Sequence, residues 1–262
     1  MLLRGKPLFE KLESRRFFAV HFAIDPLVNP HPISRYIYGV NQSLAGAYSN
    51  ATFTRSGGNR WTAYNWENNA SNAGNDYIFQ NDDALGGGNT AGGAVIPTIA
   101  NASSHNAGAL ITVPINGYVA ADKNGGGDVH YSNNTYDPAH NTWINGTPNP
   151  NYLAQRFKVE QPRKGSAFTL TPSTTDANVY ADEFVNWVKT TYPYSQTDPN
   201  RPIWFSLDNE PDLWASTHAE VHPNAVTYAE MIQKTTDYAS RCRQARPLLL
   251  AVHAPACVRS LE

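Results

Sequence analysis

The sequence predicts an α/β protein, and three observations carry this prediction. Short apolar runs rich in β-branched and aromatic residues recur along the chain, as buried strands require. Stretches with helical spacing of apolar residues alternate with these runs, and long loops follow the strands. The chain has 262 residues, enough for one sizeable core. The pattern favours a parallel barrel or an open sheet.

The expected elements follow in chain order. Strands are expected over 17–25, 36–40, 51–59, 109–115 and 202–208, and helices over 89–106, 176–191 and about 225–243. "ATFTRSGGN" reads as a strand that ends at Gly57 and Gly58. Residues 117–165 read as one long irregular segment, and its Tyr and Trp content favours a functional loop over a disordered one.

Composition excludes several classes of partner. Charged residues make up 16% of the chain and the net charge is -2, so no basic surface for nucleic acid is expected. No apolar run is long enough to span a membrane. The first 25 residues do not read as a signal peptide, and residues 1–16 read as an upstream extension. Residues 1–240 contain no cysteine, so disulfides do not hold this fold.

The strongest functional signal is "PIWFSLDNEPDLW", residues 202–214. An apolar strand ends there on Asp-Asn-Glu, and Pro211 stops the strand because it cannot donate to a ladder. A carboxylate such as that of Glu210, at the carboxyl end of a barrel strand, can protonate a leaving glycosidic oxygen. The amide of Asn209 can hydrogen-bond a sugar 2-hydroxyl. The alternative is a carboxylate paired with a neighbouring arginine.

With these residues in view, the chain resembles glycoside hydrolase family 44, the endoglucanase and xyloglucanase family. The words that carry the resemblance are "HPISRYIYGVNQ", "TFTRSGGNRWTAYNWENNASNAGNDY", "ITVPINGYVAADKNGGGD", "FSLDNEPDLW" and "THAEVHPNAVTYAEM". The resemblance implies a (β/α)8 barrel with a small β-sandwich, in which Glu210 is the general acid/base and Asn209 its helper. It implies an extracellular, retaining endo-β-1,4-glucanase, with xylan and xyloglucan as further substrates, that requires no cofactor.

The resemblance also implies a division of the chain. Residues 17–35 would supply a β-sandwich strand and linker, and residues 36–240 about the first half of the barrel. Open barrel edges would then favour self-association. Residues 241–262 are atypical, with both cysteines and four arginines, and a shifted reading frame or fused vector sequence is the favoured explanation. The alternative is a divergent strand, "PLLLAVHAP".

A cluster of aromatic and amide residues predicts the sugar contacts. Aromatic faces with amides between them suit sugar rings, although core packing is the ordinary role of any single aromatic residue. The residues expected to bind successive glucose units are Asn59, Trp61, Tyr64, Asn65, Trp66 and Trp214.

Two further questions concern metals and the second carboxylate. His218, Glu220 and His222 lie close in sequence and give a weak zinc alternative, against a loop that hydrogen-bonds within itself. "DKNGGGD" lacks the EF-hand spacing, so structural calcium has no placed ligands. A retaining glycosidase needs a nucleophile, which the family places at its seventh strand. The later acids, Glu220, Glu230 and Glu262, do not fit that place, so a non-catalytic glucan-binding fragment is the rival function.

Overall fold

The computed structural model describes residues 31–41, 43–244 and 250–251. The chain separates into two compact units, Met1–Ser34 and Arg35–Glu262. All of the described helices and strands belong to the second unit. The predicted extension 1–16 and the strand over 17–25 lie outside the described residues. Among the helices that are described, none is long and apolar enough to cross a membrane.

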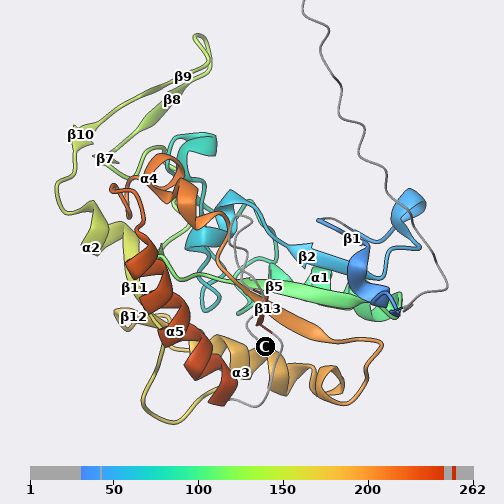
Figure 1. Ribbon diagram of the computed structural model, residues 1–262. Helices are drawn as coiled ribbons and strands as arrows, with labels where there is room; N and C mark the ends of the chain where they lie inside the picture. Colours follow the sequence, from blue (N-terminus) through green and yellow to red (C-terminus); the bar gives the residue numbers. More distant parts are fainter. Residues whose placement is uncertain (1–30, 42, 245–249, 252–262) are drawn as a thin grey trace, which may run out of the picture. The chain divides into compact units, whose positions relative to one another are not determined.

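The centre of the fold is a five-stranded sheet in which every pairing is parallel (Figure 1). Its strands, in spatial order, are β1 (Gly39–Val40), β2 (Phe53–Ser56), β5 (Gly108–Val113), β13 (Ile203–Leu207) and β14 (Leu250–Ala251). Spatial order equals chain order, so each strand is followed by a crossover to its next neighbour. The predicted α/β class is confirmed.

In the described part of the crossovers lie three helices of more than two turns: α1 (Val95–Ser104), α3 (Ala181–Thr191) and α5 (Tyr228–Gln244). Helix α1 packs on β2 and β5, and α3 packs on α5. All three are shorter at their amino ends than the sequence predicts. Gly92, at a φ of 66°, lies in the turn that precedes α1. Before α3, Val179 lies in strand β12 (Asn178–Tyr180), because its β-branched side chain suits a ladder better than a first helical turn.

Residues 117–165 are more regular than predicted, because short strands there carry too few residues to show a period. Strands β6 (Tyr118–Ala120) and β11 (Phe157–Gln161) join β12 in a three-stranded sheet. Between them lie β7 (Tyr131–Ser132), β8 (Thr135–Asp137), β9 (Thr142–Ile144), β10 (Thr147–Pro148) and α2 (Tyr152–Arg156). The prediction of one irregular segment was wrong there.

The remaining elements are short and lie mainly in the loops. They are β3 (Ser71–Asn72), β4 (Asn81–Asp82), α4 (Trp214–Thr217), and the 3-10 helices η1 (Arg35–Ile37), η2 (Gly46–Tyr48), η3 (Asn59–Ala63), η4 (Gly74–Tyr77), η5 (Pro193–Gln196) and η6 (Pro211–Leu213).

The core lies between the central sheet and its helices. All six residues of β5 are buried, which explains their unbroken apolar run. The side chains of Ile111, Phe205 and Leu207 belong to the same buried cluster as Ile99 of α1 and Phe184 of α3. The strands and helices that alternate in the sequence therefore pack into one common core.

The carboxyl-terminal part of the described chain continues the fold. Helix α5 runs past residue 240 to Gln244, and β14 pairs in parallel with β13 through Leu250 and Ala251. Strand β14 lies within the run "PLLLAVHAP". The favoured explanation of residues 241–262 and its alternative, a divergent strand, both stay predictions.

A buried carboxylate next to a lysine of β11 makes stability depend on pH. Glu67 is buried, and its Oε2 lies 3.6 Å from Nζ of Lys158 on β11. Burial raises the pKa of Glu67 to about 8, against the attraction of Lys158 and with the repulsion of Asp176 and Glu183. The folded state therefore holds this proton to a higher pH than the unfolded state does, and stability falls as pH rises from about 4.5 to about 8.

We expect Glu67→Gln to remove most of this loss, because an amide does not ionise. Thermal unfolding at pH 5 and pH 8 measures it: the Tm of the variant should fall less between the two than that of the wild type. Asp212→Asn, which replaces an exposed carboxylate, is the control and should follow the wild type. Equal falls for Glu67→Gln and the wild type would show that Glu67 stays ionised when buried.

Candidate active site

Strand β13 ends in a tight turn that presents Glu210. The backbone of Asp208 and of Glu210 lies in the left-handed region, at φ of 62° and 47°. Residues other than glycine adopt that region at a cost, and such positions gather at functional sites. Pro211 then opens η6, where its fixed φ suits a first helical position. The side chain of Glu210 is exposed beyond this turn, whereas Asp208 and Asn209 are buried.

The carboxylate of Asp208 fixes the turn from inside. Its Oδ2 accepts a hydrogen bond from the backbone N–H of Ile115 at 2.7 Å. Its Oδ1 accepts from the N–H of Asn209 at 2.8 Å and from the indole Nε1–H of Trp214 at 3.3 Å. Burial raises the pKa of Asp208, although these donors favour the ionised form. One buried carboxylate thus ties together the ends of β5 and β13 and the start of α4.

The amide of Asn209 is held in one orientation. Its Oδ1 accepts from Nη2 of Arg55 at 2.7 Å and from the N–H of Gly58 at 3.1 Å. Its Nδ2–H is thereby turned to Oε2 of Glu210, at 3.0 Å. Arg55 lies on β2, two strands from β13, and was not among the site residues predicted from the sequence. A charged residue just before Gly57 and Gly58 at a strand end is the signal that could have found it.

Helix α5 contacts both the loop after β5 and Trp214 through Lys234. Nζ of Lys234 donates to the carbonyls of Ile115 and Asn116 at 2.9 and 3.0 Å. The same ammonium lies 5.6 Å from the ring centre of Trp214. The loops after β5 and β13 are therefore joined through one lysine as well as through Asp208.

All four aromatic residues predicted to bind sugar belong to the buried core, and three of them are at most 2% exposed, so for these three that prediction is wrong. Trp66 is 2% exposed and stacks on Phe184, with ring centres 5.5 Å apart. Tyr64 is 1% exposed, and its hydroxyl donates to Oδ1 of Asn69. Trp214 is fully buried beside His222. Ring faces that are covered by other side chains cannot stack on a sugar.

The two amides predicted beside them have structural partners. Asn65 is fully buried, where it donates to the carbonyl of Ala120 and accepts from the N–H of Glu67. The prediction that Asn65 contacts sugar was wrong because its side chain is buried. The side chain of Asn59 is half-buried and donates to the carbonyl of Ala73 at 3.0 Å.

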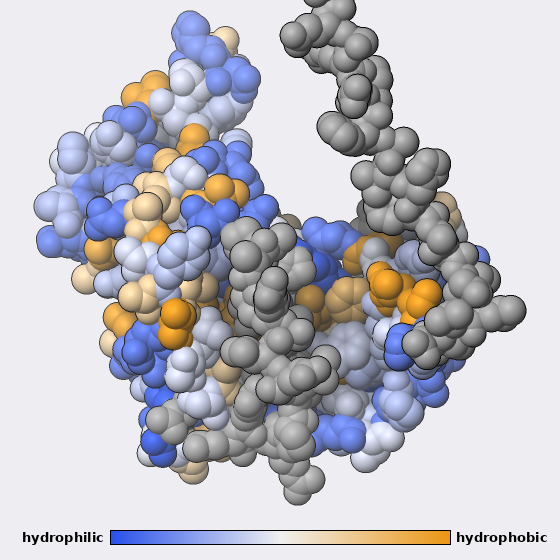
Figure 2. Space-filling model, viewed as in Figure 1, coloured by the Kyte–Doolittle hydropathy of each residue, from blue (hydrophilic) through white to orange (hydrophobic). Residues whose placement is uncertain are grey.

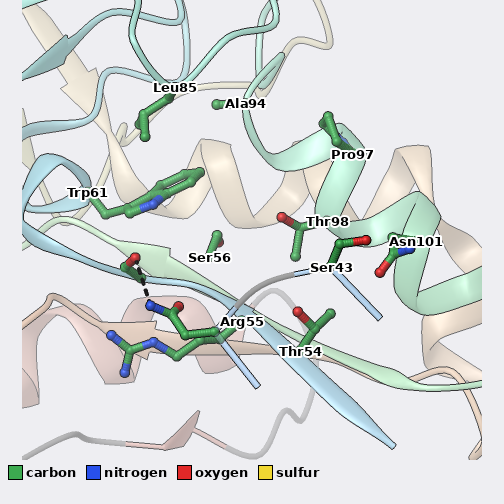
Figure 3. A pocket seen from close by; sticks show the side chains of 12 residues that line it. Ser43, Thr54, Arg55, Ser56, Trp61, Leu85, Ala94, Pro97, Thr98 and Asn101 are labelled. Atoms are coloured by element: carbon green, nitrogen blue, oxygen red, sulfur yellow. Dashed lines mark hydrogen bonds between the residues drawn. The ribbon is translucent and has the colours of Figure 1, made fainter. Parts of the chain in front are cut away.

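Trp61 lines a cavity of about 360 Å³ beside β2 and α1 (Figure 3). In Figure 3 its ring lies across from the α1 residues Thr98 and Asn101, and the guanidinium of Arg55 points away from these three side chains. The lining residues are Asn41, Ser43, Thr54, Arg55, Ser56, Gly57, Trp61, Leu85, Ala94, Pro97, Thr98 and Asn101. Of the predicted aromatic contacts, Trp61 alone lines this cavity.

The loop with His218 and Glu220 bonds within the protein. The Nδ1 of His218 lies 2.8 Å from Oε1 of Glu220, and its Nε2 lies 3.0 Å from the carbonyl oxygen of Asn59. Burial opposes protonation, yet the hydrogen bond and charge of Glu220 raise the pKa of His218. No group of three or more His, Cys, Asp or Glu in the described ranges suits a metal ion. The weak zinc alternative therefore finds no support in this loop.

The role of Asp208 predicts a stability effect. Asp208→Asn replaces an acceptor oxygen by a donor that faces N–H groups, so it should lower the free energy of unfolding by about 1–3 kcal/mol. Urea denaturation measures this change. The matched control is Asp212→Asn, an exposed carboxylate in the same loop, which should change stability by no more than about 0.5 kcal/mol. Equal, small effects of the two changes would contradict the role given to Asp208.

Comparison with known proteins identifies the family. Residues 70–257 match the model of glycoside hydrolase family 44. The chain is 39% identical over 215 residues to β-mannanase/endoglucanase A of Caldicellulosiruptor saccharolyticus, a match that covers 79% of this chain and 14% of that protein. It is 35% identical over 236 residues to endoglucanase A of Paenibacillus lautus, covering 87% of this chain and 31% of that protein.

Solved structures of family 44 enzymes are also similar to this chain. Cel44A, the family 44 endoglucanase of Clostridium thermocellum, superposes with a TM-score of 0.70 at 36% identity, over 86% of this chain and 42% of that one. A family 44 xyloglucanase of Paenibacillus polymyxa, solved with xyloglucan, gives a TM-score of 0.67 at 34% identity, over 82% and 40% of the two chains. The chain thus spans less than half the length of these relatives, and over that span it belongs to glycoside hydrolase family 44.

Proposed function

We propose that this chain carries the acid/base half of a retaining endo-β-1,4-glucanase that acts on cellulose-type β-glucans. Xylan and xyloglucan are further candidate substrates. One observation carries the proposal: an exposed Glu210 at the carboxyl end of a central parallel strand, with its carboxylate hydrogen-bonded to an oriented amide. Neighbours named endoglucanase and xyloglucanase support it.

The chemistry follows from the two side chains. Glu210, when protonated, donates its proton to the glycosidic oxygen as the bond from that oxygen to the anomeric carbon breaks. As that bond breaks, the nucleophile's carboxylate bonds to the anomeric carbon; after the first sugar product leaves, the carboxylate of Glu210 takes a proton from the water that attacks this carbon and displaces the nucleophile. Asn209 keeps its Nδ2–H on the substrate side, where a sugar 2-hydroxyl can accept from it, because Arg55 and Gly58 occupy its oxygen.

A retaining reaction needs a second carboxylate about 5 Å from the first. Asp208 and Glu220 are buried and hydrogen-bonded, and Glu230 contacts Nε2 of His222, so we assign the nucleophile to none of them. We propose that the five parallel strands are part of a (β/α)8 barrel, and that a later strand of that barrel supplies the nucleophile.

Several expectations accompany this proposal. The protein would act outside the cell and need no cofactor, with structural calcium left open. The β1 and β14 edges of the described sheet each have one neighbour among the described strands, which favours self-association through them. The alternative function is a non-catalytic glucan-binding fragment, which the lack of a fitting second carboxylate among Asp208, Glu220 and Glu230 favours. Release of reducing sugar from carboxymethylcellulose by this chain separates the two.

The acid/base role predicts how substrates respond to Glu210→Gln. Hydrolysis of unactivated glucans should fall by orders of magnitude while binding stays near normal, because the leaving oxygen loses its proton donor. Aryl glycosides with good leaving groups need no such proton, so their glycosylation step should be less affected. Initial rates on both substrates measure the difference.

The control is Asp212→Asn, which changes an exposed carboxylate two residues away and should keep wild-type rates on both substrates. Equal losses on glucans and on activated aryl glycosides, accompanied by loss of stability, would show that Glu210 has a structural role instead.

A further inference from the structure

Residues 131–148 form a narrow two-stranded arm, here called the 131–148 arm, that projects from the body of the second unit (Figure 1). Strand β7 pairs with β10 at its base, and β8 pairs with β9 beyond them, each pair antiparallel. The seven residues 131–137 include a bend at Asn133, where φ is 60°, and reach at most about 23 Å. That reach is enough to lie along several sugar units of an extended polysaccharide.

The base of the arm is fixed to the loop that follows Glu210. Val129, just before the arm, and Val221, just after Glu220, belong to one small buried cluster against which Tyr152 packs. The hydroxyl of Tyr152 donates to the carbonyl of Glu220 at 2.9 Å. The arm follows β5 and Glu210 follows β13, and the carboxyl ends of these paired parallel strands lie at one edge of the sheet. The arm therefore rises from the same edge as Glu210.

The arm is held by specific contacts at its base. Asn134 donates through Nδ2 to the carbonyl of Asp128 at 2.7 Å and accepts through Oδ1 from the N–H of Gly146 at 3.2 Å. The ring of Trp143 covers Gly127 so closely that a Cβ there would lie 2.9 Å from a ring carbon. Gly127 also has a φ of 95°, a conformation that glycine adopts most readily. These contacts order the arm's base without a partner chain.

The surface of the arm has the chemistry that sugars require. Its ring pair is Tyr136 and Trp143, with centres 5.4 Å apart, and Tyr136 is 42% exposed. The Tyr136 hydroxyl donates to Oδ1 of Asn141 at 2.6 Å. Four asparagines lie within residues 131–148, together with one Asp and one His and no Lys or Arg. Figure 2 shows the projecting part coloured mostly as hydrophilic.

The charges on the arm indicate which class of ligand it can bind. The Asp and the His, residues 137 and 140, lie 2.6 Å apart and pair with each other, so the arm offers neither a polyanion nor a polycation a complementary charge. A neutral polyhydroxyl chain matches the amides and the aromatic faces. We propose that the 131–148 arm binds an extended β-glucan chain beyond the bond that Glu210 protonates. The proposal rests on the proposed function and names a second contact for its substrate.

The test compares two changes in the arm with two controls. Tyr136→Ala removes the exposed ring, and deletion of residues 135–144 joins Asn134 to Asn145-Gly146, a pair that favours a tight turn between β7 and β10. The first control is Tyr38→Ala, which changes a 75% exposed tyrosine just before β1. Tyr38 therefore lies at the amino ends of the parallel strands, whereas the arm and Glu210 lie at their carboxyl ends. The second control is Asp212→Asn, which changes an exposed carboxylate in the loop after β13. Circular dichroism and Tm confirm that each protein is folded.

Electrophoresis in native gels that contain xyloglucan or hydroxyethylcellulose measures the apparent Kd. Both changes in the arm should raise it about three- to tenfold, as loss of one partly exposed aromatic contact implies. Tyr38→Ala and Asp212→Asn should match the wild type. Unchanged retention of both arm variants, or no retention of the wild type, would overturn the proposal. So would a change of oligomeric state on deletion, measured by light scattering, since a second copy would then be the occupant.

The two proposals can fail separately. If Glu210→Gln still hydrolyses glucans, the acid/base assignment is wrong, and retention by the arm is unaffected. If the arm variants bind as the wild type does while Glu210→Gln abolishes hydrolysis, the arm proposal is wrong and the acid/base assignment is supported.

Discussion

The buried carboxylate of Asp208 is the constraint on which the candidate site depends. Burying a carboxylate at the end of a parallel strand costs free energy unless hydrogen-bond donors surround it. Here two backbone N–H groups and an indole N–H donate to the carboxylate of Asp208. Each donor comes from a different segment: the loop after β5, the turn itself, and α4. Satisfying one buried charge thus fixes three segments around the turn that presents Glu210.

The residue after Asp208, Asn209, is oriented by groups on and just after another strand, β2. Arg55 on β2 and the N–H of Gly58 both point at the oxygen of Asn209, which leaves its Nδ2–H for Glu210. Preorganised donors of this kind are effective because they need not reorganise during the reaction. The left-handed backbone at Glu210 is consistent with this account, since strain of that kind persists only where surrounding contacts enforce it.

The sequence predicts the parts of this arrangement that are local. The runs over 109–115 and 202–208 are buried strands, and the position of Glu210 after the second follows from Pro211. The partners of Asn209 and Trp66 could not be predicted in this way, because Arg55 is 154 residues from Asn209 and Phe184 is far from Trp66 in the chain. An aromatic residue among asparagines looks the same in sequence whether its face meets a sugar or another ring.

The most direct test of this account is a crystal structure of the Arg55→Met variant. We expect the β13 backbone and the three contacts of Asp208 to remain, because Arg55 takes no part in them. We expect Asn209 to lose its fixed orientation and the 3.0 Å contact to Glu210, whose carboxylate should then occupy more than one position. A variant in which Asn209 and Glu210 keep their wild-type positions would show that Arg55 does not orient them.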